Sequence, residues 1–501
     1  PRCSNEVAQS PPSQRRPEAS RVGGRKSVHA MGGRMNHWAI PVLLLSSCWA
    51  LSFAVLTSGA AASNLAAASL TSVATLTSFP LAFTTFTSGL YNLILPFEIE
   101  WLGRYRAYLL GALVGLAGCL VCWAGMVVQS LALLLIGCLA IGVGLSHSQN
   151  YRFGVLQCVP QQHHPVAISW VLAGGVAGAV LGPEYSKHTR NVIEGVPFGG
   201  IYLVSAGCFG LLMVLLVIGA PALRPLMKQV GGGRASSPPR ATSEASEGTA
   251  KALAAAQAQD VAEGAGTNTG QGALPMRRLV TIYAEPRTLA ATLVAALAYG
   301  SMVFTMSGVP LAMATSQDGA AAPLFSFQQS SLVVQLHMVS MFAPSFITGH
   351  LIRKFGVPAV QYGGALVLCI GSVLCLTVPK TLFANYASGQ SAVGLGWNWC
   401  FIAATSDLQH ALRPTERMRV QALNDLIVFS CAGTGSLLSG VALRNIGWAG
   451  MNYVAIGIAV TIVLVVFVAN ILARKQAARS NDDALAEKSG RDEKWCAEEG
   501  V

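Results

Sequence analysis

Long apolar stretches alternate with short polar turns along most of the chain. A helix of about 20 residues spans the ~30 Å hydrocarbon core of a bilayer, and each stretch has roughly this length. The pattern predicts an all-α integral membrane protein with twelve transmembrane helices in two groups of six. The expected helices cover residues 38–57, 70–95, 107–128, 131–152, 167–186, 200–219, 288–313, 328–352, 358–378, 383–405, 421–442 and 449–472.

Three segments lack this pattern. Residues 1–36, 222–286 and 474–501 are rich in charge or in Gly, Ser, Ala and Pro. They hold too few large apolar residues to offset the entropy of ordering, so we expect all three to be disordered. The chain then divides into a cytoplasmic N-terminus, a six-helix half over 37–221, a cytoplasmic linker, a second six-helix half over 287–473 and a cytoplasmic tail.

Composition supports a membrane protein and excludes a water-soluble one. Of the 501 residues 52% are hydrophobic and 11% are charged, whereas soluble domains carry about a quarter charged residues. Twelve Cys are scattered, mostly within apolar stretches, and none shows the spacing of a metal site. We therefore expect no metal and no cofactor.

The net charge of +11 is distributed along the chain instead of forming one basic patch, which argues against nucleic acid as a partner. If both termini are cytoplasmic, 29 of the 33 Lys and Arg fall on the cytoplasmic side, as the positive-inside rule requires. The plasma membrane is the expected location and an organelle membrane the alternative. A basic run before Ile40 and the small residues Ala60 to Ala62 also fit a signal peptide, but the long apolar run favours a first membrane helix.

The two predicted halves repeat one another. Glycines and prolines recur at a nearly constant offset, which predicts two pseudo-symmetric bundles that rock around a central site. The matching positions, 252 to 254 residues apart, are Gly103 and Gly356, Gly142 and Gly394, Gly144 and Gly396, and Pro160 and Pro414.

The loop after the second predicted helix holds Glu100, Gly103 and Arg104. From about Trp38 to Leu472 the chain resembles the major facilitator superfamily, whose loop at this place reads G-x-L-x-D-R-x-G-R-[RK]. The resemblance implies twelve helices, solute transport and a loop that latches the halves together on the cytoplasmic side. The second copy of the loop keeps Gly349, Leu351, Lys354 and Gly356, with Arg353 at the acidic position.

Two further features belong to this resemblance. The fifth predicted helix carries Gly174, Gly178, Gly182 and Pro183, which resembles a glycine-rich motif of the superfamily; small residues at this spacing also let helices pack closely. Residues 340–349 and 419–425 resemble a bacterial-type branch associated with riboflavin uptake.

Ionisable groups at membrane depth are costly, by about 2.5 kcal/mol or more, and are therefore candidates for function. Arg152 is either a snorkelling residue or an anion-binding or gating residue. Asp425, next to Asn424, begins a helix, and a carboxylate there is stabilised by the helix dipole; we expect both residues in the latch, with Arg104 as the partner of Asp425. His337 is either a packing residue or, with Gln335, contacts the solute or carries a coupling proton.

Amide and aromatic side chains complete the candidate site. Trp397 and Asn398 in the tenth predicted helix and Tyr299 in the seventh would form an aromatic wall, with Gln149 and Tyr151 in the fourth. Such a wall with a few polar groups suits a planar, weakly charged solute.

We therefore expect a transporter that moves a small organic solute by alternating access. A flavin or a similar planar, polar metabolite is the favoured solute, with a proton or another ion as a candidate coupling partner. The alternative is a non-transporting receptor or sensor on the same scaffold, although the linker and tail supply no folded module for it. The chain lacks the clustered His or acidic ligands of a membrane enzyme and the charged ring of a channel, so neither is expected.

Overall fold

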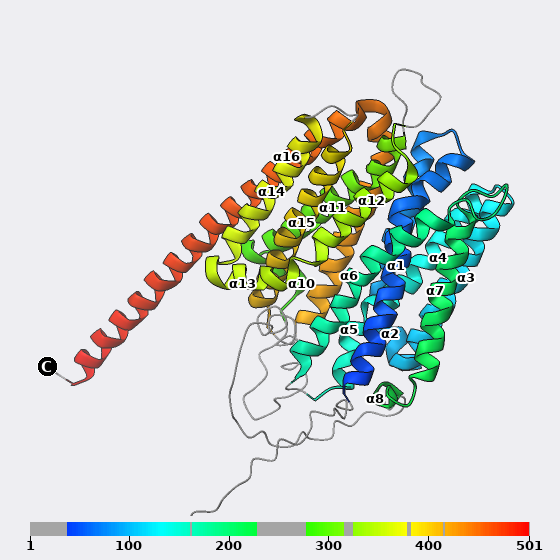
Figure 1. Cartoon of the computed structure of the whole chain (residues 1–501). Coiled ribbons are helices and arrows are strands. Elements are labelled where there is room, and N and C mark those ends of the chain that lie inside the picture. Colours follow the sequence, from blue (N-terminus) through cyan, green and yellow to red (C-terminus); the bar gives the residue numbers. More distant parts are fainter. Residues whose placement is uncertain are drawn as a thin grey trace, which may run out of the picture. The chain divides into compact units, whose positions relative to one another are not determined.

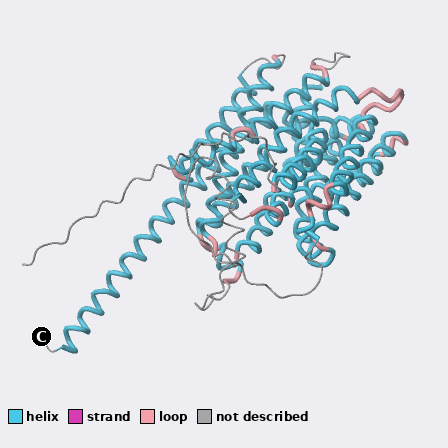
Figure 2. Tube along the Cα trace, turned by 60° about the horizontal axis from the view of Figure 1, so that its bottom comes forward, coloured by secondary structure: helices cyan, strands magenta, loops and turns pink. Residues whose placement is uncertain are grey.

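The computed structural model describes residues 38–160, 163–227, 277–314, 324–377, 382–413 and 416–499. Every regular element in these ranges is a helix, as Figure 2 shows. The predicted N-terminal segment 1–36 and most of the predicted linker lie outside the described residues, and so do the predictions made for them.

Helices α1 to α7 form the first group of helices, drawn from blue to green in Figure 1. Long helices are joined here by short turns, and a short helix, α8 (Arg224–Met227), follows them. The elements of this group are α1 (Ala39–Leu70), η1 (Ala74–Ser78), α2 (Phe79–Leu102), α3 (Arg104–Val127), α4 (Leu131–Gln149), α5 (Tyr151–Gly154), η2 (Val155–Gln157), α6 (His164–Thr189) and α7 (Gly199–Ile218).

Helices α11 to α16 form the second group, which α10 (Leu279–Tyr283) precedes. The elements of this group are α11 (Pro286–Ala314), α12 (Phe327–Phe342), α13 (Ser345–Phe355), α14 (Val357–Thr377), α15 (Phe383–Ala411) and α16 (Arg417–Glu499).

Eight helices within the described ranges are long and apolar enough to cross a membrane, and the bent pair α12–α13 raises the number to nine. The chain is therefore an integral membrane protein, but twelve spans are not confirmed. Helix α2 misses the criterion and carries Glu98 and Glu100 near its end. Helix α16 contains both of the last predicted spans, separated by a break at Gly447 (φ 68°, ψ −179°).

Two predictions about order and extent were wrong. The tail, expected to be disordered, continues as helix to Glu499. Its Ala, Glu, Lys and Arg residues have high helix propensity, which the argument from hydrophobic content did not weigh. Helix α1 extends to Leu70, well past the predicted end at 57, and α2 begins only at Phe79 because η1 lies between them.

The sequence repeat is also a repeat of backbone geometry. Gly103 ends α2 with φ 80° and ψ 151°, and Gly356 ends α13 with φ 83° and ψ 160°. Each donates its backbone N–H to a residue 253 positions from its counterpart, Ile99 in the first copy and Ile352 in the second. A positive φ is strained for residues with a side chain, so both loops need glycine here.

Helix packing repeats as well. In the first group a Cβ on Gly137 would lie 2.4 Å from Cys122 Sγ, and in the second a Cβ on Gly389 would lie 2.4 Å from Cys375 Sγ. The close approach of α3 to α4 thus recurs between α14 and α15. The two groups are therefore copies in their packing and not only in their glycine positions.

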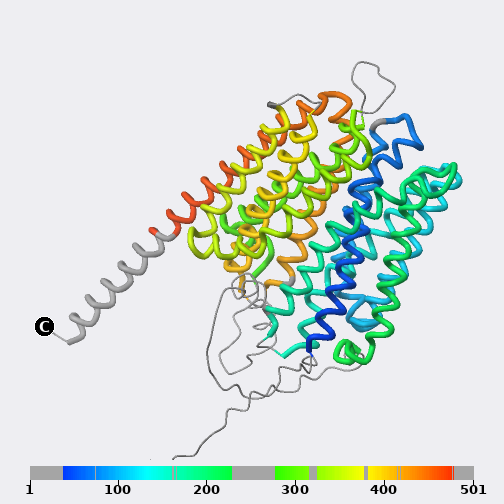
Figure 3. Tube along the Cα trace, viewed as in Figure 1, coloured from blue at the N-terminus to red at the C-terminus, as the bar shows by residue number. Residues whose placement is uncertain are grey.

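The two groups meet along their length, through α1 with α11 and α12, α2 with α16, and α6 with α12. Figure 3 shows the two groups side by side, the first in blue to green and the second in green to orange. Asn64 donates a hydrogen bond to the Ser307 carbonyl at 3.1 Å, and Ser78 donates one to the Leu437 carbonyl at 2.9 Å. These contacts hold the ends of α1 and α11 and the start of α2 against the other group.

Candidate functional site

A cavity with about 620 Å³ of empty space lies between the two groups of helices. Helices α1, α2 and α4 supply one wall and α11, α12 and α16 the other. The lining residues are Phe53, Leu56, Ala60, Leu81, Thr84, Thr85, Ser88, Leu145, Gln149, Tyr299, Met302, Val303, Met306, Met338, Met341, Phe342 and Phe429.

Tyr299 lies on the aromatic side of this cavity. Its ring makes an edge contact with Trp397 at 5.2 Å between centroids and a tilted contact with Phe429 at 5.7 Å. Trp397 stacks on Phe401 at 4.9 Å and is 5% exposed, so it supports Tyr299 from behind without lining the cavity. Edge-to-face packing of this kind fixes the orientation of the rings.

The polar side of the cavity comes from the first group. Gln149 donates a hydrogen bond from Nε2 to Ser88 Oγ at 3.0 Å, and both residues line the cavity. Thr84 lies nearby and donates to the Pro80 carbonyl at 2.9 Å. An aromatic wall thus faces an amide and hydroxyl groups.

A pair of opposite charges connects the groups one turn beyond Gln149. Arg152 of α5 and Asp425 of α16 interact electrostatically, and Asp425 accepts hydrogen bonds from Gln421 at 2.7 Å and Asn424 at 3.3 Å. The structure therefore gives Asp425 a partner other than the predicted Arg104. Arg104 interacts instead with Tyr108 of its own helix.

Gln335 and His337, predicted to act together, face different neighbours. Gln335 accepts a hydrogen bond from Lys187 at 3.2 Å and donates one to the Val180 carbonyl at 3.2 Å, so it joins α12 to α6. His337 is fully buried, with Nδ1 2.7 Å from the Gln390 carbonyl oxygen of α15. Neither residue lines the cavity.

Asn398 supports the bend between α12 and α13. It donates two hydrogen bonds at 2.7 Å, to the Met341 carbonyl and to Ser345 Oγ, and accepts one from Thr348 at 2.6 Å. Pro344 interrupts the helix at this point and lacks an N–H, so backbone groups here need partners from side chains. Asn398 therefore holds the bend between the two helices. Tyr151 is fully buried and makes an edge contact with Tyr108 at 4.8 Å.

The glycines of the predicted fifth helix pack α6 against α1. A Cβ on Gly174 would lie 2.3 Å from the Ser46 carbonyl oxygen, and one on Gly178 would lie 2.6 Å from that of Ala50. Gly182 makes the tightest contact, and Pro183 follows it inside α6. The stripe thus serves packing within the first group.

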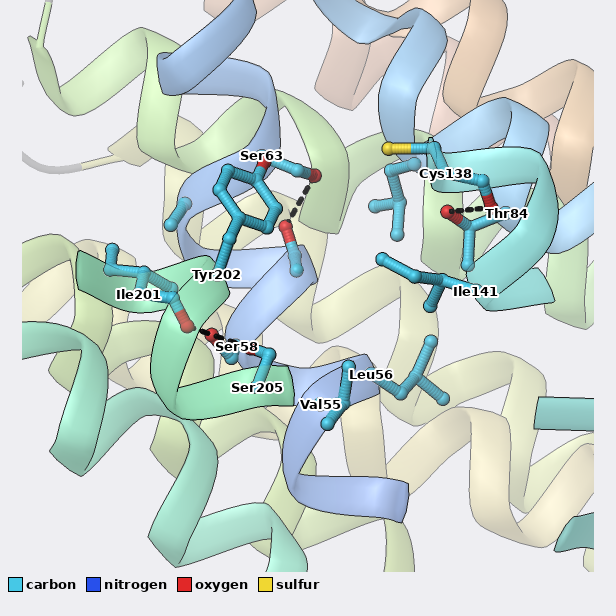
Figure 4. A pocket seen from close by; sticks show the side chains of 13 residues that line it. Val55, Leu56, Ser58, Ser63, Thr84, Cys138, Ile141, Ile201, Tyr202 and Ser205 are labelled. Atoms are coloured by element: carbon cyan, nitrogen blue, oxygen red, sulfur yellow. Dashed lines mark hydrogen bonds between the residues drawn. The ribbon is translucent and has the colours of Figure 1, made fainter. Parts of the chain in front are cut away.

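A second cavity lies within the first group, among α1, α2, α4 and α7 (Figure 4). Ser63 donates a hydrogen bond there to the Gly59 carbonyl at 2.6 Å, and Thr84 Oγ1 lies 3.2 Å from the Cys138 carbonyl oxygen. The phenol of Tyr202 is buried there without a hydrogen-bond partner. This cavity does not reach the second group of helices.

Sequence reasoning missed a buried cluster of Tyr91, Glu98 and His147, which joins α2 to α4. The signal was a second acidic residue, two positions before the motif residue Glu100, on an otherwise apolar helix. Glu100 itself is exposed. Within the described ranges, no group of three or more His, Cys, Asp or Glu could hold a metal ion.

A salt bridge joins the start of α16 to the segment before α10. Arg277 donates to both carboxylate oxygens of Glu416, at 2.8 and 2.7 Å, and also pairs with Glu285. These hydrogen bonds lower the pKa of Glu416 from 4.5 to about 2. The stabilisation is therefore fully present above pH 4.5 and is lost as the pH falls towards 2.

Glu416→Gln should lower the free energy of unfolding by about 2 kcal/mol at pH 7, the typical worth of hydrogen bonds to a charged group. The loss should be nearly the same at pH 5, because the wild-type carboxylate is still ionised there. Thermal unfolding of the purified protein at both pH values measures this. A Glu416→Gln protein as stable as wild type at pH 7 would show that the bridge contributes nothing.

An integral membrane protein with two copies of one helix arrangement and a cavity between them has the architecture of a major facilitator transporter. The crystal structure of the human organic anion transporter MFSD10 (TETRAN) matches it with a TM-score of 0.55 and 13% identity, over 86% of this chain and 99% of that one. This likeness shows the fold.

Relatives in sequence point to the same class. The chain is 28% identical to the riboflavin transporter RfnT of Brucella anthropi over 82% of its own length and 90% of that protein. It is 22% identical to the uncharacterized MFS-type transporter YddS of Bacillus subtilis over 73% of its own length and 76% of that protein. No model of a known protein family matches the chain. The predicted resemblance to the superfamily, and to a branch with a riboflavin transporter, is confirmed.

Proposed function

We propose that this transporter moves a flavin, or a solute with similar planar and polar parts, by alternating access. The observation that carries the proposal is the cavity shared by the two helix groups. Only a site built from both groups can be exposed to one side and then the other when the groups rock. The likeness to RfnT, which is named a riboflavin transporter, supports the choice of a flavin as the solute.

The chemistry of the cavity supports a flavin. A planar ring system would lie against Tyr299, Phe342 and Phe429, and the flexible methionines Met302 and Met338 would adapt to its edge. Gln149 and Ser88 offer an amide and a hydroxyl for the polar edge of the ring or for a hydroxylated chain. Arg152 lies one turn away, at the end where an anionic group would be attracted.

We further infer that the chain crosses the membrane twelve times, with both termini in the cytoplasm. Helices α2 and α15 are long enough to cross, with 24 and 29 residues, and α16 would supply two spans around Gly447. In this orientation the contacts of Asn64 with Ser307 and of Ser78 with Leu437 lie on the extracytoplasmic side. They support an arrangement that is closed on that side.

Transport is tested with the full-length protein reconstituted in liposomes. Radiolabelled riboflavin should enter vesicles that contain excess unlabelled riboflavin, and unlabelled riboflavin outside should compete. Exchange of another vitamin or of a nucleoside, but not of riboflavin, would show that the protein is a transporter and that riboflavin is not its solute. Absence of exchange for every solute of a broad panel would refute transport.

Tyr299→Leu should weaken riboflavin binding by about tenfold or more, because stacking on an aromatic side chain is worth roughly 1–3 kcal/mol. Quenching of flavin fluorescence by the purified protein measures the affinity. Tyr453→Leu is the matched control, since Tyr453 is 65% exposed on the outer surface of α16. Equal affinities of the two variants would remove Tyr299 from the site.

A further inference from the structure

Tyr91, Glu98 and His147 form a buried cluster between α2 and α4. His147 Nε2 lies 3.0 and 3.2 Å from the two carboxylate oxygens of Glu98, and Tyr91 donates its hydroxyl to Glu98 at 2.6 Å. The side chain of His147 is fully buried and that of Glu98 is 8% exposed. An acid and an imidazole shielded from water are costly unless they are paired.

The contacts of His147 show how many protons the pair holds. Its Nδ1 lies 2.9 Å from the Val143 carbonyl oxygen, so both ring nitrogens face acceptors. Both hydrogen bonds form if the imidazolium faces the Glu98 carboxylate, or if neutral His147 keeps its proton on Nδ1 and Glu98 is protonated. Each form holds the same one proton between the two residues, and each is neutral as a pair. After loss of that proton the ring has one N–H for two acceptors, so the hydrogen bond to Glu98 or the one to Val143 is lost, and the contact between α2 and α4 is weakened.

The repeat shows that the fold does not require this pair. The position equivalent to Glu98 in the second copy is Leu351, 253 residues on, and that equivalent to His147 is Trp399, 252 residues on. Glycines face the ring in both copies: a Cβ on Gly111 would lie 2.2 Å from His147 Cγ, and one on Gly363 would lie 3.3 Å from Trp399. Apolar residues therefore build the same packing, and the titratable pair is an addition to the first copy.

The cluster touches parts that must move during transport. Pro96 lies inside α2 and lacks an N–H, which weakens the helix between Tyr91 and Glu98. Helix α2 also contacts α16 across the interface of the two groups. On the same helix as His147, Gln149 reaches the cavity and binds Ser88 of α2. A change in the bond between Glu98 and His147 therefore acts on helices that line the solute cavity.

Two charged groups on neighbouring helices, Arg104 and Asp425, interact with other residues. Tyr91 is the titratable residue of α2 that contacts the pair. On α3, Arg104 and Tyr108 interact with each other, and on α16, Asp425 interacts with Arg152. Helix α1 brings Cys48 to Tyr151, away from Glu98.

We propose that Glu98 and His147 together bind one exchangeable proton whose uptake and release are coupled to transport. The proposal rests on the proposed transport function and names its coupling ion. The bound proton holds α2 beyond Pro96 against α4. Its release to water leaves a carboxylate and a neutral imidazole, which removes the charge from the bond and weakens the hold of α4 on that segment of α2.

The test compares two modes of transport in vesicles, with the membrane potential held at zero. Under a pH gradient of one unit, wild type should accumulate riboflavin up to about tenfold, the limit for one proton per solute. Glu98→Gln should lose this accumulation yet still exchange labelled for unlabelled riboflavin, a process that needs no net proton movement. Glu194→Gln, an exposed loop carboxylate, is the control and should accumulate as wild type does.

Tyr91→Phe provides a variant that keeps the pair and removes one donor to the carboxylate. Its pH of half-maximal accumulation should shift upwards, because the carboxylate form loses a hydrogen bond. Gradient-driven accumulation by Glu98→Gln at the wild-type level, or wild type that ignores the gradient while it exchanges riboflavin, would overturn the proposal.

A measurement without solute separates this proposal from the choice of riboflavin. Infrared difference spectra of the purified protein between acidic and alkaline pH should contain bands that vanish in both Glu98→Gln and His147→Gln, because the two groups share one proton. Bands unchanged in Glu98→Gln would overturn the shared proton whether or not riboflavin is transported. Wild type that shows the bands but exchanges no riboflavin would refute only the solute.

Discussion

Asp425→Asn should slow solute uptake by at least about tenfold, because it leaves the Arg152 guanidinium without its charged neighbour. Removing one partner of a fully buried ion pair costs ~3–5 kcal/mol. Arg152 and Asp425 are half-buried, so the cost is smaller, and tenfold corresponds to about 1.4 kcal/mol. The two charges come from different helix groups. Their attraction therefore changes when the groups rock, and its loss should alter the transport rate.

The double variant Arg152→Gln/Asp425→Asn distinguishes a pair from two independent residues. It should transport faster than Asp425→Asn alone, since no unpaired charge remains. The effect is measured as the initial uptake rate in vesicles for wild type, Asp425→Asn, the double variant and a control. Asp407→Asn is the control, because Asp407 pairs with Arg287 at 2.6 Å, the arginine is 52% exposed, and such pairs contribute little. A double variant no faster than the single one would contradict the coupling.

The repeat explains why much of the fold could be predicted from the sequence. Gly103 and Gly356 have a positive φ that other residues avoid. A glycine at the same place in both copies therefore predicts the same turn. Helix ends were less predictable. The segment from Ser58 to Leu70 is rich in Ala and Ser, which are only weakly apolar, yet it is helical because Asn64 and its neighbours pack against α11.

The predicted site residues fall only partly on the cavity. Tyr299 and Gln149 line the cavity, but Gln335 and His337 do not. Gln335 and His337 are two positions apart, and at about 100° per residue their side chains leave the helix roughly 200° apart. They therefore face different neighbours. The hydrogen bonds of Asn398 depend on the bend at Pro344, which brings Met341 and Ser345 to its amide. Distant contacts of this kind leave no local pattern in the sequence.

Glu98 and His147 were missed for the same reason. They are 49 residues apart and meet only because α2 and α4 pack together. In the sequence Glu98 stands next to the loop motif at Glu100, which gives no sign that its side chain is buried. In the structure that side chain is 8% exposed. Once the repeat is known, the comparison of Glu98 with Leu351 identifies the position as unusual.

Gly182→Val should prevent most of the protein from folding. A Cβ at this position would lie 2.0 Å from Thr57 Oγ1 and 2.2 Å from the Ala54 carbonyl oxygen. Overpacking typically costs about 1–3 kcal/mol where side chains can adjust. Here a backbone oxygen of α1 is an obstacle, so α1 and α6 must separate along their shared face, and the stripe of Gly174 and Gly178 would lose its contacts as well. The folded fraction after detergent extraction, and its unfolding temperature, measure the effect.

Two variants show whether the backbone contact is the cause. Gly207→Val adds the same side chain to α7 at a position with nothing within 4 Å, so it should fold as wild type does. Thr57→Ala removes the hydroxyl that Gly182 faces but leaves the Ala54 carbonyl, so Thr57→Ala combined with Gly182→Val should remain unstable. Rescue by Thr57→Ala would assign the clash to the side chain alone. Normal folding of Gly182→Val would mean that α1 and α6 lie farther apart in the membrane than the glycine stripe implies.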